Sequence, residues 1–255
     1  MYSQDIRIKK SQSSEQQATL AKHFHHNITL TRQIILRNLD NLQISIIDYD
    51  SGNLRSVTKA IERHGINPVT TSDSDTIIKS DAVILPGVGS APSAMHALSE
   101  RNLIDPIKQY ISSGKPFLGI CLGLQLLFDR TDEGNAECLG IIPGNVRLLA
   151  SGLKVPHMGW NTIDIKKKHP ILENVPSGEF FYFVHSYFVV PQDSNDITAT
   201  TDYGEAFCSI YAKNNLIATQ FHPEKSGDIG LKIYENFIDL CIKNKKDGNK
   251  ARKSN

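Results

Sequence analysis

The chain has 255 residues, of which 40% are hydrophobic and 22% are charged, as in globular proteins with a sizeable core. No apolar run approaches the roughly 18 residues that a transmembrane helix needs, so we expect no membrane association. The formal net charge is +1, but both ends are basic and the body between them is acidic. An acidic body argues against a nucleic-acid-binding surface.

Cysteine usage and the two ends of the chain indicate the compartment and the domain limits. The four cysteines contain no CxxC pair, so the pattern predicts neither a disulfide framework nor a metal site. This usage, together with an N-terminus that lacks the apolar core of a signal peptide, favours the cytoplasm. Residues 1–43 begin polar and predict a flexible extension, residues 44–241 a single domain, and residues 242–255 a basic tail.

Strand and helix patterns alternate through the first half of the domain. Leu54, Val57 and Ile61 recur at helical spacing and predict a helix that ends at Gly65. Alternating strands and helices with short loops predict a parallel sheet covered on both faces. The expected strands are Ile44–Asp48, Asp81–Leu85 and Pro116–Ile120, and the further helices are Ala91–Ser99, Leu103–Ser113 and Leu122–Asp129.

The second half is richer in strand patterns. A helix that begins near Gly227 closes the domain, with Ile229, Ile233, Phe237 and Leu240 on one face. The sequence therefore predicts an α/β fold: a single-domain three-layer α/β/α sandwich with a central, mostly parallel sheet and an antiparallel extension. The strands expected in this half are Phe180–Val184, Tyr187–Val190, Ile197–Thr201, and a hairpin of Ala206–Ala212 with Leu216–Phe221.

The sharpest motif is the pentapeptide 119–123, GICLG, at a predicted strand-to-helix junction. It resembles the nucleophile elbow G-x-S-x-G, with Cys121 in place of the serine. A tight turn there strains its central residue and needs flanking glycines to avoid clashes. The sulfur would lie at a helix start, whose unpaired N–H groups favour a thiolate. The alternative is that Cys121 is only a small buried hydrophobe.

The tripeptide His222-Pro223-Glu224 offers a base and its orienting acid. It follows a predicted strand, at the sheet edge where sites on open α/β sheets form. Alternate residues of an extended segment face the same way, so Glu224 can hold the imidazole of His222. Alone, the motif would equally fit a turn histidine whose hydrogen bonds are satisfied, but the elbow supplies a nucleophile for it.

A third element is the glycine-rich turn Pro86-Gly87-Val88-Gly89, which also follows a strand. Attack on an amide carbonyl creates an oxyanion, which correctly aimed backbone N–H groups stabilise by about 3 kcal/mol each. The N–H of Leu122, directly after the cysteine, is a candidate second donor. The alternative is that this segment is only a turn. Together with the other two motifs, however, the segment completes an acyl-transfer site.

At this point the chain resembles the class I, or triad, glutamine amidotransferases. More narrowly it is similar to the glutaminase subunit of imidazole glycerol phosphate synthase, an enzyme of histidine biosynthesis. The similarity covers about 44–241. The matching segments are IIDYDSGNLRSV (46–57), ILPGVG (84–89), GKPFLGICLGLQLLF (114–128), KVPHMGWN (154–161), YFVHSY (182–187) and QFHPEKS (220–226).

The resemblance implies hydrolysis of L-glutamine through a thioester on Cys121, with His222 as base and acid and Glu224 as its partner. It implies no cofactor and no metal ion. Gly87, Val88 and Gly89 correspond to the oxyanion strand. Residues that would hold the glutamine are Gln125, Glu133 and the main chain of His185, Ser186 and Tyr187, although Gln125 could instead be an exposed helix residue and His185 a strand histidine bonded to backbone.

The resemblance also implies a partner, a (β/α)8-barrel cyclase that receives the ammonia in a heterodimer. Channelling needs a closed interface, because free ammonia would be lost to water. Without the resemblance, Trp160 could equally pack in the core of its own chain. The residues implied at the contact are Asn53, Pro156, Met158, Trp160, Tyr182 and Lys225.

Two departures from the family and two further hypotheses remain. The family usually has glycine where Asp50 stands, and residues 1–43 have no counterpart that we can match. The chain could instead be a paralogous amidotransferase subunit that supplies a different synthase. It could also be a non-catalytic scaffold, which the intact Cys121, His222 and Glu224 disfavour.

Overall fold

The computed structural model describes residues 42–50 and 52–253, so the predicted extension lies outside the described residues except for Leu42 and Gln43. Leu42 is buried. The backbone N–H of Gln43 donates to the carboxylate of Asp81, and its carbonyl accepts from the N–H groups of Asp81 and Ala82. Both residues therefore join the domain that was predicted to start at residue 44.

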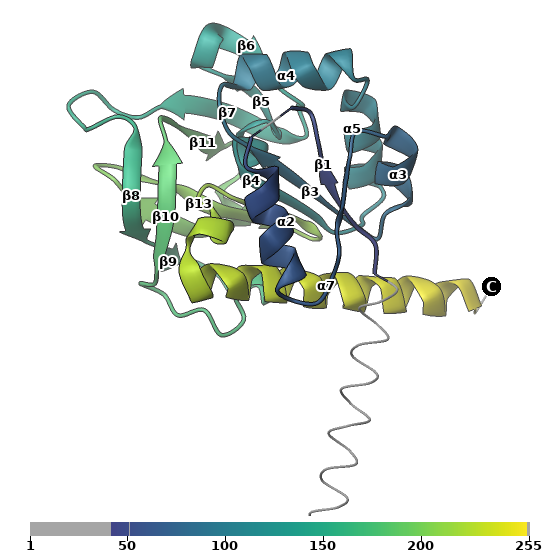
Figure 1. The fold of residues 1–255 in the computed structure, drawn as a ribbon. Coiled ribbons are helices and arrows are strands. Elements are labelled where there is room, and N and C mark those ends of the chain that lie inside the picture. Colours follow the sequence, from purple (N-terminus) through teal and green to yellow (C-terminus); the bar gives the residue numbers. More distant parts are fainter. Residues whose placement is uncertain (1–41, 51, 254–255) are drawn as a thin grey trace, which may run out of the picture. The chain divides into compact units, whose positions relative to one another are not determined.

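The central sheet has eight strands, and the expected fold class is confirmed (Figure 1). Its first five strands pair in parallel and the remaining pairs are antiparallel. The predicted hairpin is confirmed as the antiparallel pair of β13 and β14. In spatial order the strands are β2 (Val69–Thr71), β1 (Ile44–Ile47), β3 (Ala82–Gly87), β4 (Phe117–Cys121), β14 (Leu216–Thr219), β13 (Ala206–Lys213), β12 (Ile197–Asp202) and β9 (Asp164–Ile165).

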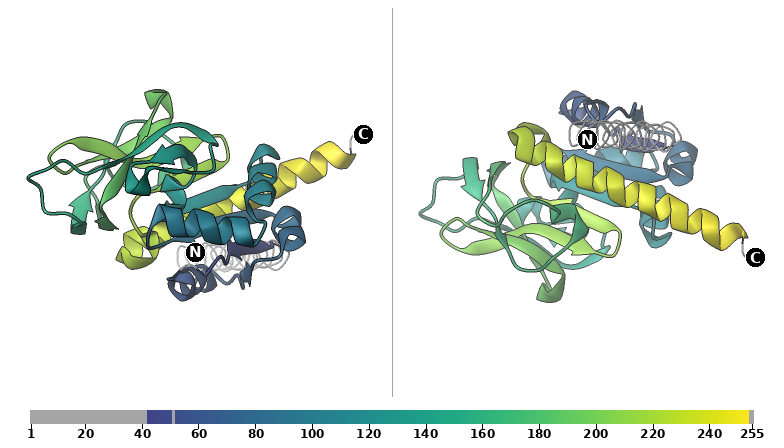
Figure 2. Two further views of the ribbon diagram at one scale, coloured as in Figure 1. Left: turned by 90° about the horizontal axis from the view of Figure 1, so that it is seen from above. Right: turned by 90° about the horizontal axis from the view of Figure 1, so that it is seen from below.

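Helices cover both faces of this sheet (Figures 1 and 2). Helix α2 contacts α7 on one face, and α3 contacts α5 on the other, as right-handed crossovers on either side of β1 require. Helix α7 continues through residues 242–253, where a basic tail was expected. None of the helices in the described residues is long and apolar enough to cross a bilayer. The helices are α2 (Leu54–Glu62), α3 (Ser74–Lys79), α4 (Ala91–Glu100), α5 (Ile104–Ser112), α6 (Leu122–Gln125) and α7 (Gly227–Lys253).

Two smaller sheets lie beside the antiparallel half of the central sheet (Figure 1). Strands β10 and β11 were expected, whereas their partners were not predicted. The two-stranded sheet pairs β10 (Phe180–His185) with β8 (His157–Thr162), and the four-stranded sheet is β11 (Tyr187–Pro191), β7 (Ile142–Leu148), β5 (Phe128–Thr131) and β6 (Ala136–Glu137). The described residues also form the 3-10 turns η1 (Glu133–Asn135), η2 (Pro170–Leu172), η3 (Ser194–Asp196) and η4 (Pro223–Lys225).

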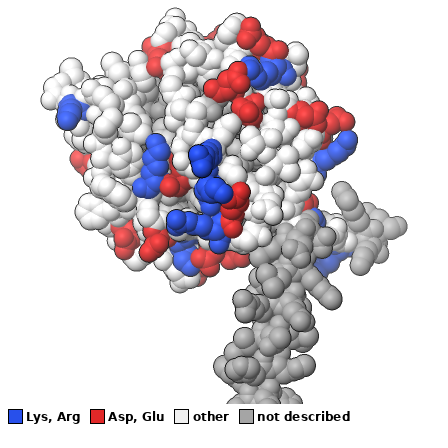
Figure 3. Space-filling view, viewed as in Figure 1, with Lys and Arg blue, Asp and Glu red and all other residues white. Residues whose placement is uncertain are grey.

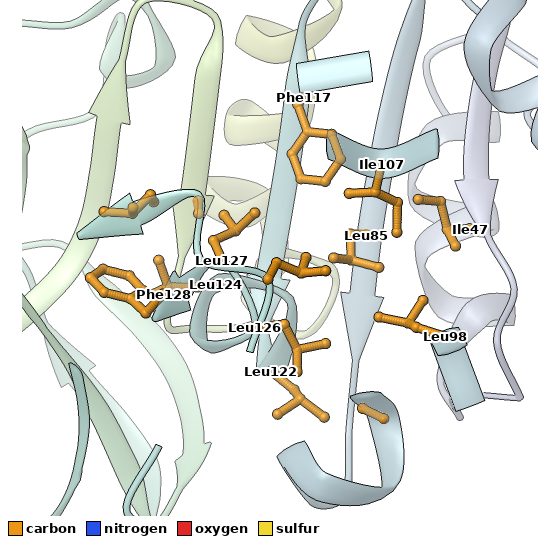
Figure 4. Close-up of a cluster of buried hydrophobic side chains, with 14 of the residues drawn as sticks. Ile47, Leu85, Leu98, Ile107, Phe117, Leu122, Leu124, Leu126, Leu127 and Phe128 are labelled. Carbon is orange, nitrogen blue, oxygen red and sulfur yellow. The ribbon is translucent and has the colours of Figure 1, made fainter. Parts of the chain in front are cut away.

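The helix expected over Leu122–Asp129 is wrong in its second half. Helix α6 ends at Gln125, and Phe128 already pairs with Ile142 as the first residue of β5. The apolar run that suggested a longer helix is buried on all sides instead: Leu122, Leu124, Leu126, Leu127 and Phe128 belong to the main hydrophobic cluster (Figure 4). Residues with no polar face show no helical periodicity. Their burial fixes the start of α6, and with it Cys121.

Candidate active site

Cys121 lies at the junction of β4 and α6 in a strained backbone conformation. Its φ is 54° and its ψ is −105°, a combination that residues with a side chain rarely adopt. The flanking glycines are required by space. A Cβ on Gly123 would lie 1.9 Å from the carbonyl oxygen of Leu85, and one on Gly119 would lie 2.9 Å from the carbonyl oxygen of Gly123. The pentapeptide therefore forms the turn that the sequence predicted.

The thiol of Cys121 is nearly buried and has two polar neighbours. Its side chain belongs to a residue only 5% exposed. Sγ donates toward the carbonyl oxygen of Val184 at 3.8 Å and accepts from Nε2 of Gln220 at 3.8 Å. Neither Val184 nor Gln220 was expected in the site from the sequence, although Gln220 stands only two residues before His222.

His222 and Glu224 form the predicted pair. Nδ1 of His222 donates to Oε1 of Glu224 at 2.7 Å, and the two side chains are 1% and 0% exposed. This bond fixes the imidazole tautomer, because Nδ1 carries the proton and leaves Nε2 free to accept one. Among the described residues, the buried Nε2 has no hydrogen-bond partner. It is therefore available for the proton of the nucleophile.

Two further side chains hold Glu224 in place. The amide Nδ2 of Asn53 donates to its Oε1, and the hydroxyl of Tyr234 donates to its Oε2 at 3.3 Å. Asn53 was expected at the partner contact, and the structure links it directly to Glu224. Tyr234, on α7, was missed because it lies on a buried helix face with no motif around it.

The electrostatics of the site favour the imidazolium that forms when His222 accepts a proton. Burial on its own lowers the pKa of His222, but the neighbouring Cys121 and Glu224 outweigh it and raise the pKa well above the ordinary histidine value. The charge of both groups contributes, and so does the hydrogen bond to Glu224. An imidazolium between a sulfur and a carboxylate is the arrangement that activates a cysteine nucleophile.

The predicted oxyanion residues lie next to Cys121. Strands β3 and β4 pair so that Gly87 is opposite Cys121. A Cβ on Gly87 would lie 2.8 Å from Cβ of Leu122, so only glycine allows this approach. Gly89 has a φ of +94°, which also favours glycine. The structure thus brings Gly87, Val88 and Gly89 beside the first N–H of α6.

A cavity of about 350 Å³ joins these elements at the carboxyl ends of the parallel strands. Its size is at the small end of ligand pockets. Cys121 and His222 both line it, and so do all five residues predicted to hold the substrate. The lining residues are Val88, Gly89, Cys121, Leu122, Gln125, Glu133, Pro156, Val184, His185, Ser186, Tyr187, His222 and Lys225.

Gln125 and Glu133 are fixed by backbone contacts. Gln125 is 5% exposed, so it is not the surface residue that the alternative required. Its amide donates to the carbonyl oxygen of Tyr187 at 2.8 Å. Oε2 of Glu133 accepts the N–H of Ala91 at 2.7 Å. The Glu133 carboxylate therefore lines the cavity and also accepts the first N–H of α4.

Behind the cavity wall, two buried histidines form a hydrogen-bonded chain. Nδ1 of His185 lies 2.9 Å from the carbonyl oxygen of Tyr187, and His185 Nε2 lies 3.0 Å from Nδ1 of His157. Nε2 of His157 in turn lies 3.3 Å from Nδ2 of Asn161. Burial lowers the pKa of His157, and lowers that of His185 to about 3. Both rings are therefore neutral, and the His185 side chain is bonded to backbone.

The remaining residues expected at the partner contact lie mostly on the outer face of the two-stranded β8–β10 sheet. Met158 is 61% exposed and Trp160 is 56% exposed. Trp160 packs edge-on against Tyr182, and the ammonium of Lys225 lies 5.9 Å from the Tyr182 ring. Pro156, which follows a cis peptide bond, is exposed and borders the cavity.

Comparison with known proteins agrees with this geometry. Residues 45–240 match the family "Glutamine amidotransferase class-I". A HisH subunit of imidazole glycerol phosphate synthase from Dehalococcoides mccartyi is 50% identical over 204 residues, which are 80% of this chain and all of that protein. The corresponding subunit from Aquifex aeolicus is 51% identical over 194 residues, covering 75% of this chain and 94% of that protein.

Solved structures show the same architecture at lower identity. The crystal structure of a putative GMP synthase protein from Thermoplasma acidophilum has a TM-score of 0.63 and 19% identity, and the match covers 82% of this chain and 98% of that one. At this identity the likeness establishes the fold alone. The family match and the sequence relatives show that the chain belongs to the class I glutamine amidotransferases and, within them, to the HisH subunits of imidazole glycerol phosphate synthase.

Proposed function

We propose that this chain hydrolyses L-glutamine to glutamate and ammonia and passes the ammonia to the cyclase subunit of imidazole glycerol phosphate synthase. The observation that carries the proposal is one cavity lined by Cys121 and His222, with Glu224 bonded to His222 from behind. Relatives that share half of the sequence are named as subunits of that synthase. The four cysteines are free thiols, which supports the cytoplasm as the compartment.

The chemistry follows from the contacts. The sulfur of Cys121 attacks the side-chain carbonyl carbon of glutamine while Nε2 of His222 takes the thiol proton. The carbonyl oxygen becomes an oxyanion, stabilised by backbone N–H groups of the 87–89 segment and of Leu122. His222 then returns a proton to the leaving nitrogen, which departs as ammonia and leaves a thioester. Water activated by His222 releases glutamate and restores the thiol.

Substrate binding uses charges already present at the cavity wall. The carboxylate of Glu133 is the ionic partner for the α-ammonium of glutamine. Gln125 and the main chain of residues 185–187 provide hydrogen bonds for the rest of the amino acid. Since neither glutamine nor glutamate requires redox or group-carrier chemistry, the proposed reaction uses side chains and water alone.

The partner is a (β/α)8-barrel cyclase that binds the outer face of the β8–β10 sheet as a heterodimer. Exposed Met158, Trp160 and Phe180 give this face an apolar centre of the kind that interfaces use. A hollow of about 450 Å³ adjoins it, with Arg55, Lys59, Arg63 and Lys225 among its lining residues. Figure 3 shows Lys and Arg side chains gathered on this side of the molecule, so the partner should present acidic groups there.

The proposal is tested by measuring glutamate release from glutamine with the full chain, alone and with the cyclase plus its ligand. We expect turnover that rises strongly with the cyclase present and is lost in Cys121→Ala. Cys138→Ala is the matched control, because Cys138 is a partly buried thiol outside the cavity. Equal turnover with and without the cyclase would contradict the partner, and full activity of Cys121→Ala would contradict the mechanism.

A further inference from the structure

The oxyanion segment, residues 86–91, is held at both of its ends. At its start the hydroxyl of Tyr49 donates to the carbonyl oxygen of Pro86 at 3.0 Å. At its end the N–H of Ala91 donates to the carboxylate of Glu133 at 2.7 Å. Between these anchors lie the glycine-rich residues that face Cys121. The peptide groups free to turn are therefore those between the two anchored positions.

Tyr49 is itself rigidly placed. It follows β1, is 2% exposed and belongs to the main hydrophobic cluster. A buried phenol needs a partner for its hydroxyl, and the bond to Pro86 provides one. The same oxygen presses against the next residue, because a Cβ on Gly87 would lie only 2.5 Å from it. One side chain thus fixes two successive residues of the oxyanion segment.

The segment that follows Tyr49 runs along the same loop. A Cβ on Gly52 would lie 3.2 Å from Cγ2 of Val88, which places this backbone against the middle of the oxyanion segment. Asn53, the next residue, bonds to Glu224. Tyr49 is absent from the lining of the cavity, so it reaches the substrate only through the backbone it holds.

We infer that Tyr49 is a positioning residue for the oxyanion hole: its hydroxyl holds the Pro86–Gly87 peptide so that the following N–H groups point at the reacting carbonyl oxygen. This inference rests on the proposed glutaminase activity. It assigns to Tyr49 an effect on the transition state alone, because the oxyanion exists only there. Binding of glutamine, which depends on Glu133 and the 185–187 main chain, does not depend on the Tyr49 hydroxyl.

The test compares Tyr49→Phe with wild type in the full chain, with the cyclase present. Phenylalanine keeps the ring and removes only the hydroxyl. We expect kcat for glutamine to fall about tenfold, since misaimed donors lose part of the hundredfold or larger effect of an oxyanion contact. KM should stay within about twofold. Alkylation of Cys121 by iodoacetamide forms no oxyanion, so its rate should not change.

Tyr110→Phe is the matched control, because the Tyr110 hydroxyl is buried and bonds to the carbonyl oxygen of Pro116 away from the cavity. It should leave kcat, KM and alkylation at wild-type values. A Tyr49→Phe variant with unchanged or higher kcat, or with equal losses in turnover and alkylation, would overturn the inference. An inactive wild type would overturn the proposed function, and the inference with it. An active wild type with an unaffected Tyr49→Phe variant would overturn the inference alone.

Discussion

The side-chain amide of Asn53 donates to Oε1 of Glu224, the same oxygen that accepts the hydrogen bond of the His222 imidazole. The two residues are 171 positions apart in the sequence. Asn53 precedes α2 at the face proposed for the cyclase, whereas Glu224 is buried. The contact therefore connects the residue before α2 directly to the carboxylate that holds the His222 imidazole.

Asn53→Gly should lower kcat about fivefold with little change in KM, because one of the donors that orient Glu224 is lost. Glycine is chosen because Asn53 has a φ of 77°, a conformation that alanine would strain. Steady-state glutamate release with the cyclase present is the measurement. Asn214→Gly, at a turn asparagine with a φ of 55°, is the matched control and should be unchanged. Equal effects of both substitutions would contradict the role of this contact.

Cys121→Ala should lower the pKa of His222. With the sulfur gone, burial still opposes the charged imidazole and only Glu224 still favours it. Histidine NMR titration of wild type and variant measures the shift directly. An unchanged His222 titration in Cys121→Ala would show that the two side chains do not interact, and Cys138→Ala reports any indirect effect.

The buried histidine pair should make the fold sensitive to acid. The folded-state pKa of His185 is about 3 and its unfolded value about 6.5, so the unfolded chain binds a proton that the folded chain does not. Stability is therefore full above pH 6.5 and falls as the pH drops toward 3, by up to about 1.4 kcal/mol per pH unit. Urea unfolding of His185→Gln between pH 7 and 4 should show a shallower loss. His96→Gln, at a 73% exposed side chain, should follow wild type.

Gly123→Ala should destabilise the fold by about 3 kcal/mol or more, because its Cβ would overlap the carbonyl oxygen of Leu85 at 1.9 Å. Gly248→Ala is the contrasting substitution. It lies within helix α7 with nothing within 4 Å of the added Cβ, and should be neutral or stabilising by up to about 1 kcal/mol. The midpoints of thermal unfolding of both variants, compared with wild type, measure these changes in stability. A wild-type midpoint for Gly123→Ala would show that the elbow can relax.

Trp160→Ala should weaken binding of the cyclase about thirtyfold, the effect of a 2 kcal/mol contact at an interface centre. Titration calorimetry with the full chain and the cyclase measures it. Val69→Ala is the control, because Val69 is 42% exposed on β2, at the opposite edge of the central sheet. Equal affinities for both variants and wild type would show that the interface does not include the outer face of the β8–β10 sheet.

Local patterns predicted much of the first half of the fold. Short apolar runs marked β1, β3 and β4, and the elbow pentapeptide was recognisable because its turn permits little but glycine on either side of Cys121. The strands between Phe128 and Ile165 were not predicted. Strand β7, with the sequence IPGNVRL, contains both proline and glycine, so its pairing depends on neighbours that are distant in the chain.

The proposed triad could be assigned from sequence because His222 and Glu224 are two residues apart and Cys121 sits in a motif of its own. The supporting contacts could not. Tyr234 reaches Glu224 from a long helix, and Tyr49 reaches Pro86 from the loop after β1, so only the packing of whole elements brings them together. Asp50 has a φ of 65°, which accounts for the glycine usual at this position, and it forms an ion pair with Arg101.

Strand β8 serves two environments at once. Met158 and Trp160 point to the outside, whereas His157 and Asn161 belong to the hydrogen-bonded chain that ends at the carbonyl oxygen of Tyr187. Because neighbouring side chains in a strand alternate between faces, inserting or deleting one residue here would exchange the two sets. The proposed docking face and the buried histidine chain would then be lost in the same event, so a change in length affects both sets, whereas a single substitution affects one.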